Sequence, residues 1–154
     1  NLPRVCLIIK AHTRGSGALN IREKKQLESS PFVIFAENSI HSTSLIVPAD
    51  IVINFGSSVG FEALRQRKLV INPTYLHDND TFFDNSGAVY DVTDEASVLE
   101  CIQCRQNGDL PLIEQATIDH FLMQRVDGGA DNRDVLQDYL DLIGGNWGES
   151  DTQR

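Results

Sequence analysis

The chain has 154 residues, of which 41% are hydrophobic and 23% are charged. These values are typical of one ordered globular domain and leave little room for a second. The formal net charge of −9 argues against the basic surface stripe of a nucleic-acid-binding protein, so we expect no nucleic-acid partner.

Continuous apolar runs of strand length predict the β-strands. In chain order they are Val5–Ile9, Phe32–Phe35, Ile51–Phe55, Leu69–Ile71 and Ala88–Tyr90. Continuous rather than alternating apolarity indicates burial on both faces, as in a parallel sheet.

Helical patterns separate these strands. The expected helices are Ile21–Leu27, Ser42–Val47, Val59–Arg67, a helix capped by Thr93 that ends near Gln106, Pro111–Arg125 and Asn132–Ile143. The last carries one apolar stripe made of Val135, Leu136, Tyr139, Leu140 and Ile143. The alternation predicts an α/β fold for residues 1–143, a Rossmann-like three-layer sandwich with a mostly parallel sheet of about five strands. Residues 144–154 are Gly-rich and polar, and we expect a flexible tail there.

The three cysteines do not suggest a disulfide framework, because their number is odd. Cys6 falls in the first strand and is expected in the core. Cys101 and Cys104 have CxxC spacing but fall inside a helix, whereas a redox or metal role needs a helix N-terminus or further ligands. A reducing, cytoplasmic location is the simple inference.

No apolar run approaches the ~18 residues that span a bilayer, and no secretory signal peptide is visible. The chain begins with Asn1 rather than Met, so we expect it to be a piece of a longer protein.

The strongest candidate for a binding site is the turn between the third strand and its helix. Ligands of parallel sheets bind beyond the carboxyl ends of the strands. Gly56, Ser57 and Ser58 stand there, and a helix N-terminus with small residues suits a phosphate. Glu62 lies one helical turn further, on the same face as Ser58, where a carboxylate can accept hydrogen bonds from ribose hydroxyls. The alternative is a serine cap followed by a solvent-facing glutamate.

The first strand ends in a second cluster of polar residues. Lys10, His12 and Arg14 alternate along the chain, so an extended backbone would place them on one side. Lys and Arg are suited to phosphate. His41 follows the second strand and His77 the fourth, on the same expected edge. No metal is expected, because the acidic loop after His77 lacks the spacing of a known ion loop.

Other nucleotide motifs are absent from the sequence. It contains no GxGxxG, no GxxxxGK[ST] and no GxSxG, which argues against an ordinary NAD site, a P-loop and a hydrolase elbow.

Three segments together resemble the carboxyl-terminal domain of GT-B glycosyltransferases of bacterial surface and capsular polysaccharide synthesis. They are Lys10–Arg14, with Thr13 where the family has Pro; Ala49–Leu64 followed by Lys68–Pro73, of which the first holds the Ser-Ser-x-x-x-Glu turn; and Asp127–Arg133, similar to the family's Asp-Gly-x-Ala-x-x-Arg. Nucleotide-sugar 2-epimerases and CDP-glycerol glycerophosphotransferases share this domain. The resemblance covers roughly residues 5–143.

The resemblance implies half of a GT-B fold that binds a UDP- or CDP-linked donor without a metal. Ser57 and Ser58 would hold the diphosphate and Glu62 the ribose. His12 and Arg14 would act near the phosphates as the catalytic pair that neutralises the leaving nucleotide, with Lys10, Gly56 and His77 at the binding site. The saccharide acceptor would bind a separate amino-terminal domain, and the isolated piece would not turn over. A peripheral association of the full-length protein with the inner face of the membrane is compatible with this role.

Two alternatives remain open at this point. One is a nucleotide-sugar 2-epimerase domain on the same architecture. The other is a non-catalytic α/β module that binds an anion or a protein.

Overall fold

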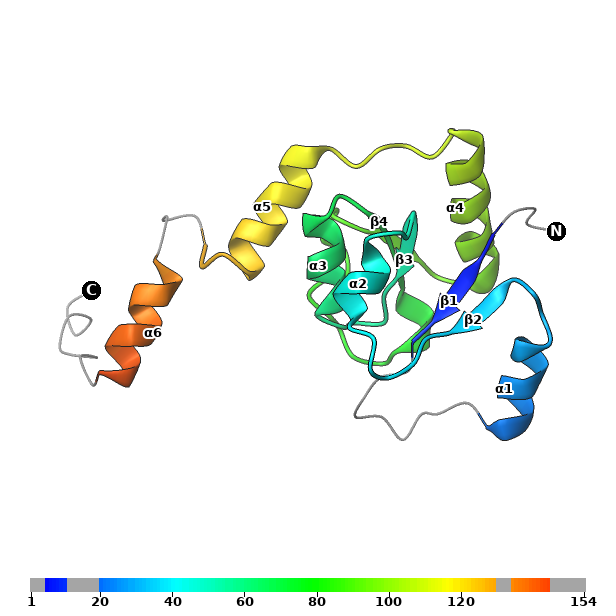
Figure 1. Ribbon diagram of the computed structural model, residues 1–154. Helices are drawn as coiled ribbons and strands as arrows, with labels where there is room; N and C mark the ends of the chain where they lie inside the picture. The colour runs from blue at the N-terminus through cyan, green and yellow to red at the C-terminus, as the bar shows by residue number, and fades with distance from the viewer. Residues whose placement is uncertain (1–4, 11–19, 130–133, 145–154) are drawn as a thin grey trace.

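The computed structural model describes residues 5–10, 20–129 and 134–144 (Figure 1). The predicted sites at His12 and Arg14, and the predicted tail beyond Gly144, lie outside these residues. Five strands are found in the described part. They are β1 (Leu7–Ile9), β2 (Val33–Phe35), β3 (Ile51–Ile53), β4 (Leu69–Pro73) and β5 (Tyr90–Val92).

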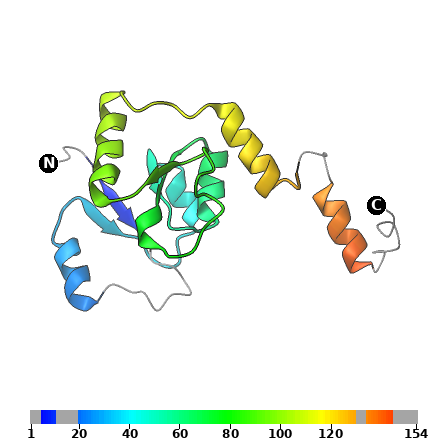
Figure 2. The same cartoon turned by 180° about the vertical axis from the view of Figure 1, so that it is seen from behind.

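All of these strands pair in parallel, as predicted, but they do not form one sheet. β1 pairs with β2, and β3, β4 and β5 form a separate sheet in that order. The expectation of a single sheet of about five strands is therefore wrong. In Figures 1 and 2, β1 lies nearer to the three-stranded sheet than β2 does. The break between the two sheets therefore falls between β1 and β3.

The helices follow the predicted order with small shifts at their ends. They are α1 (Ile21–Glu28), α2 (Ser42–Ile46), α3 (Val59–Arg65), α4 (Glu95–Asn107), α5 (Gln115–Arg125) and α6 (Val135–Ile143), with a short 3₁₀ helix η1 (Thr74–Leu76). Asp94 rather than Thr93 caps α4, because its carboxylate accepts from the Ser97 N–H at 2.7 Å. α5 begins four residues later than predicted, since Pro111 lies in an extended segment whose carbonyl accepts from the Tyr90 hydroxyl.

The hydrophobic core lies around the three-stranded sheet. α3 contributes the fully buried Ala63 and Leu64, and α5 packs against α3. Phe83 packs against both helices, with its ring centroid 4.6 Å from that of Phe61 and 5.8 Å from that of Phe121. This core positions the turn at the N-terminus of α3.

The sheet of β1 and β2 contributes nothing to that core. Leu7, Ile8 and Ile34 are exposed, and so is Cys6, so the predicted burial on both faces is wrong for these two strands. α1 packs against β2, where Lys24 Nζ lies 5.4 Å from the centroid of the Phe35 ring. Since Phe35 and Ile34 point to opposite faces of the strand, α1 covers one face only.

The last helix, α6, stands away from the body beyond α5 (Figures 1 and 2). The predicted helix is confirmed, but Leu136, Tyr139, Leu140 and Ile143 on its apolar stripe are exposed.

Candidate functional site

The turn after β3 requires glycine at position 56 for two reasons. Its backbone has a φ of 68°, in the left-handed region, and an added Cβ would come within 2.9 Å of Thr81 Cγ2. The Ser57 N–H donates to Asn54 Oδ1 at 3.2 Å, and Ser57 Oγ accepts from the Val59 N–H at 3.4 Å. Ser58 occupies the N-cap position of α3 without a capping hydrogen bond from its side chain and is exposed. The Ser58 hydroxyl is therefore not needed for the helix itself.

Glu62 is tied to the loop after β2. The Thr43 hydroxyl donates to Glu62 Oε2 at 2.5 Å, and this bond joins the first turn of α2 to α3. His41 is the N-cap of α2, and its Nδ1 accepts from the Thr43 N–H at 3.3 Å. The same Nδ1 lies 2.9 Å from Thr43 Oγ1. The glutamate is half-buried, so its carboxylate is held in one orientation rather than free in solvent.

Lys10 follows β1 and reaches toward the end of β2. Its Nζ donates to the carbonyl of Asn38 at 3.4 Å. Because β1 and β2 are parallel, their carboxyl ends meet at one edge, and Lys10 lies there as the sequence predicts.

His77 belongs to a second polar cluster, beside the Gly56 turn rather than beside Glu62. Its Nδ1 is 2.7 Å from the carbonyl of Asn79, and its Nε2 is 3.8 Å from Asp84 Oδ1. Asp84 accepts from the Thr81 N–H and hydroxyl, both at 2.8 Å. Since Thr81 also touches Gly56, the loop of His77 packs against the predicted phosphate turn.

The fully buried Asn72 holds this second cluster together. Its Nδ2 donates to Asp84 Oδ1 and to Asp91 Oδ1, each at 2.7 Å. Asp91 Oδ2 accepts in turn from the Asn85 N–H at 2.8 Å. One amide group thus bridges two carboxylates that would otherwise repel each other.

The carboxyl group of Asp84 makes the stability depend on pH. Burial raises the pKa of Asp84, but the Thr81 N–H and the Asn72 and Thr81 side chains together lower it by more, so this pKa lies below its ordinary value. A lowered pKa contributes stability above the pKa of the unfolded chain, and that stability is lost as the pH falls through the folded value. We expect the free energy of unfolding to decrease as the pH is lowered below about 4. The decrease should be smaller in the Asp84→Asn variant. Urea unfolding across this pH range measures it, and equal profiles for the two proteins would contradict the assignment.

Several residues of the site were not predicted. Thr43 and Asp84 carry no sequence signal of their own, because their partners are distant in the chain. Asn54 and Asn72 do carry one, since each is a polar amide beside apolar strand residues: Asn54 falls within the run Ile51–Phe55, and Asn72 follows the run Leu69–Ile71. Both are buried, and each makes hydrogen bonds with one of its two amide atoms, Asn54 through Oδ1 and Asn72 through Nδ2.

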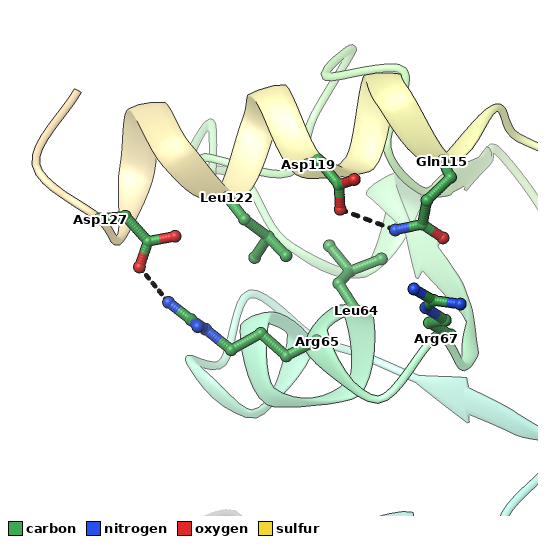
Figure 3. A pocket seen from close by; sticks show the side chains of 7 residues that line it. All are labelled: Leu64, Arg65, Arg67, Gln115, Asp119, Leu122 and Asp127. Carbon is green, nitrogen blue, oxygen red and sulfur yellow. Dashed lines mark hydrogen bonds and ion pairs between the residues drawn. The ribbon is translucent and has the colours of Figure 1, made fainter. Parts of the chain in front are cut away.

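A pocket of about 360 Å³ lies elsewhere, between the C-terminal half of α3 and α5 (Figure 3). Arg65 and Asp127, which line it, form an ion pair, and Gln115 Nε2 donates to Asp119 Oδ1 at 2.7 Å. Its lining contains none of the predicted site residues. Because these polar groups satisfy one another, the pocket is a weaker candidate than the strand edge.

The CxxC pair lies in the middle of α4, as predicted, and both thiols are half-buried. Burial, together with Cys104 and Glu100, raises the pKa of the Cys101 thiol, which lowers its thiolate fraction. In the described part of the chain no three His, Cys, Asp or Glu side chains are arranged to hold a metal ion. The same residues include no helix long and apolar enough to cross a bilayer.

No protein-family model matches this chain, and comparison with curated proteins and with solved structures also finds no match.

Proposed function

We propose that this domain binds the nucleoside diphosphate of a UDP- or CDP-linked donor, as the donor half of a transferase in surface polysaccharide synthesis. The binding site is the edge where β1, β2 and β3 end. The diphosphate lies against the Gly56–Ser58 turn and Lys10, and the ribose lies against Glu62. His12 and Arg14 act on the leaving phosphate, and His77 lines the site from the neighbouring loop. The saccharide acceptor comes from another domain.

The hydrogen bond from Thr43 to Glu62 is the observation that carries this proposal. It brings the loop after β2 and the helix after β3 into contact at one edge, beside a turn whose glycine is required by close packing. A carboxylate fixed in this way is preorganised to accept further bonds, since it offers about four lone-pair sites. The proposal adds Lys10, which follows β1, as the cation beside this acceptor and the hydroxyl groups of the turn, because a nucleotide needs such a set.

A thermal-shift titration of the chain with UDP, CDP, GDP and ADP tests the proposal. We expect saturable stabilisation by UDP or CDP, because a ligand bound only to the folded state raises its stability. Glu62→Ala should weaken that affinity about tenfold to a hundredfold, the value of hydrogen bonds to a charged group.

Two variants serve as controls for the titration. Thr43→Val keeps the carboxylate but frees it, and should weaken binding less than Glu62→Ala does. Glu100→Ala removes an exposed acid from α4, away from the site, and should change nothing. Unchanged affinity in Glu62→Ala would overturn the ribose assignment. No stabilisation by any nucleotide would favour a non-catalytic module.

A further inference from the structure

The pocket between α3 and α5 is lined by one cation that has no partner. The charged residues of the lining are Arg65, Arg67, Asp119 and Asp127. Arg65 pairs with Asp127, and Asp119 accepts a hydrogen bond from Gln115. Within the part of the chain that the structure describes, the Arg67 guanidinium makes no ion pair or hydrogen bond. Figure 3 shows it across the pocket from Gln115 and Asp119, with nothing drawn between them.

Water alone can satisfy an exposed guanidinium, but the backbone at Arg67 is unfavourable for an arginine. Its φ is 57°, in the left-handed region. The Arg67 N–H donates to the Leu64 carbonyl at 2.9 Å, and the Lys68 N–H donates to the Ala63 carbonyl at 3.0 Å. These two bonds end α3 in a Schellman motif, whose left-handed position glycine usually occupies. A side chain there costs free energy, and glycine would make the same backbone bonds. The helix end therefore does not explain the arginine, and its side chain needs another role.

We propose that this pocket binds a small carboxylic acid that carries hydroxyl groups, such as a sugar acid, and that Arg67 holds its carboxylate. A guanidinium binds a carboxylate by two parallel N–H···O bonds, which fix its orientation. The volume of about 360 Å³ lies within the range of small-molecule sites, about 300–1,000 Å³. This inference does not depend on the proposed nucleotide site, because the two sites share no residue.

The charges of the lining favour a carboxylate over a phosphate. Once Arg65 and Asp127 have paired, one cation, Arg67, and one anion, Asp119, remain. A ligand with a single negative charge neutralises Arg67. A phosphate would bring a second negative charge into a pocket that already holds the Asp119 carboxylate, and like charges at this range repel.

The other polar groups of the pocket call for donors on the ligand. The bond between Gln115 and Asp119 uses Gln115 Nε2 and Asp119 Oδ1, so Gln115 Oε1 and Asp119 Oδ2 can accept from a ligand. Hydroxyl groups supply such donors. Leu64 and Leu122, which are 1% and 6% exposed, form the apolar floor between these groups, and the C–H groups of a sugar ring can pack there. The pocket thus offers a cation, two acceptors and an apolar surface.

Titration of the isotope-labelled full chain with glucuronate, followed by NMR, tests the proposal. We expect saturable shifts of the backbone amides of Arg67, Gln115 and Asp119. Glucose has the hydroxyl groups without the carboxylate, and acetate has the carboxylate without the hydroxyl groups. Each should bind at least about tenfold more weakly, because each lacks one part of the set of bonds. Inorganic phosphate should also bind more weakly than glucuronate.

Variants at position 67 test the assigned residue. Arg67→Gly suits the left-handed backbone, so the urea midpoint should stay the same or rise, while the affinity for glucuronate should fall at least about tenfold. Arg67→Lys keeps the charge without the two-pronged geometry and should bind with intermediate affinity. Arg22→Ala is the control, because it removes an exposed arginine of α1 outside the pocket and should leave the affinity unchanged.

Three results would overturn the proposal. The first is the absence of saturable shifts with glucuronate in the wild-type chain. The second is an affinity for glucose, acetate or phosphate equal to that for glucuronate. The third is an unchanged affinity in Arg67→Gly, which would assign the binding to other groups.

Discussion

Replacing Phe83 by alanine is expected to lower the free energy of unfolding by about 3–5 kcal/mol, the usual result of removing a buried phenylalanine. The side chain is 1% exposed and packs against both Phe61 and Phe121, whose rings also stack on each other. Its removal leaves a cavity beside the stacked rings of Phe61 and Phe121, which α3 and α5 hold in place. Since domains of this size are stable by only about 5–15 kcal/mol, the loss takes a large share of the total. Urea unfolding monitored by circular dichroism measures it.

The preceding residue provides a matched control. Phe82 is 65% exposed, and its ring lies 5.4 Å from the Arg125 guanidinium carbon. Phe82→Ala should lower the free energy of unfolding by no more than about 1 kcal/mol, the value of an exposed cation–π contact. Similar losses for the two variants would mean that the aromatic cluster is not the centre of the core.

Replacing Asn72 by aspartate is expected to lower the free energy of unfolding by about 3–5 kcal/mol at neutral pH, as an uncompensated buried charge does. The change is nearly isosteric, but it exchanges the donor that bridges Asp84 and Asp91 for a third carboxylate. Burial and the two neighbours raise the folded pKa of the introduced group above its unfolded value. Its destabilising effect is therefore smallest at low pH, where the protonated group can still donate one hydrogen bond, and grows as the pH rises above about 4. Urea unfolding of variant and wild type over this range measures the difference.

A second substitution should recover part of this loss. Asp91→Asn in the same chain keeps an oxygen for the Asn85 N–H and turns an amide nitrogen toward the introduced carboxylate. The exchange of acid and amide thus restores one of the two bonds. A double-mutant cycle should show coupling between the positions. Simple additivity of the two losses would contradict the proposed bridge.

The sequence predicts the central part of the fold well, because the apolar run, the turn residues and the helix formers there all agree with the observed packing. The predicted strand Ile51–Phe55 and the predicted helix Val59–Arg67 match β3 and α3 within two residues. The division of the sheet could not be predicted in this way. The apolar runs Val5–Ile9 and Phe32–Phe35 identify β1 and β2 as strands, but an apolar run does not show which layer covers it. Cys6 illustrates the point, since the sequence expects it in the core and it is exposed.

The sequence predicts which residues of the candidate site follow the strands, but not which residues they contact. Lys10, Gly56, Ser57, Ser58 and Glu62 all follow strands whose carboxyl ends define the ligand edge of a parallel sheet. Their hydrogen bonds join residues up to 28 positions apart, as between Lys10 and Asn38. Thr43 became part of the site only through such a bond, and the approach of His77 to Asp84 carried no signal in the sequence.

The absence of the first strands from the core divides the molecule into two units of cooperativity. Every buried residue in the described part of the chain lies between Ile46 and Leu122. The unit of β1, α1 and β2 therefore opens at a free energy below that of global unfolding. The amide hydrogens of Leu7–Ile9 should then exchange faster than those of Leu69–Pro73. A phosphate held between Lys10 and the Ser57 turn would contact both units. Its apparent affinity would then be lowered in proportion to the population in which the unit of β1, α1 and β2 is open.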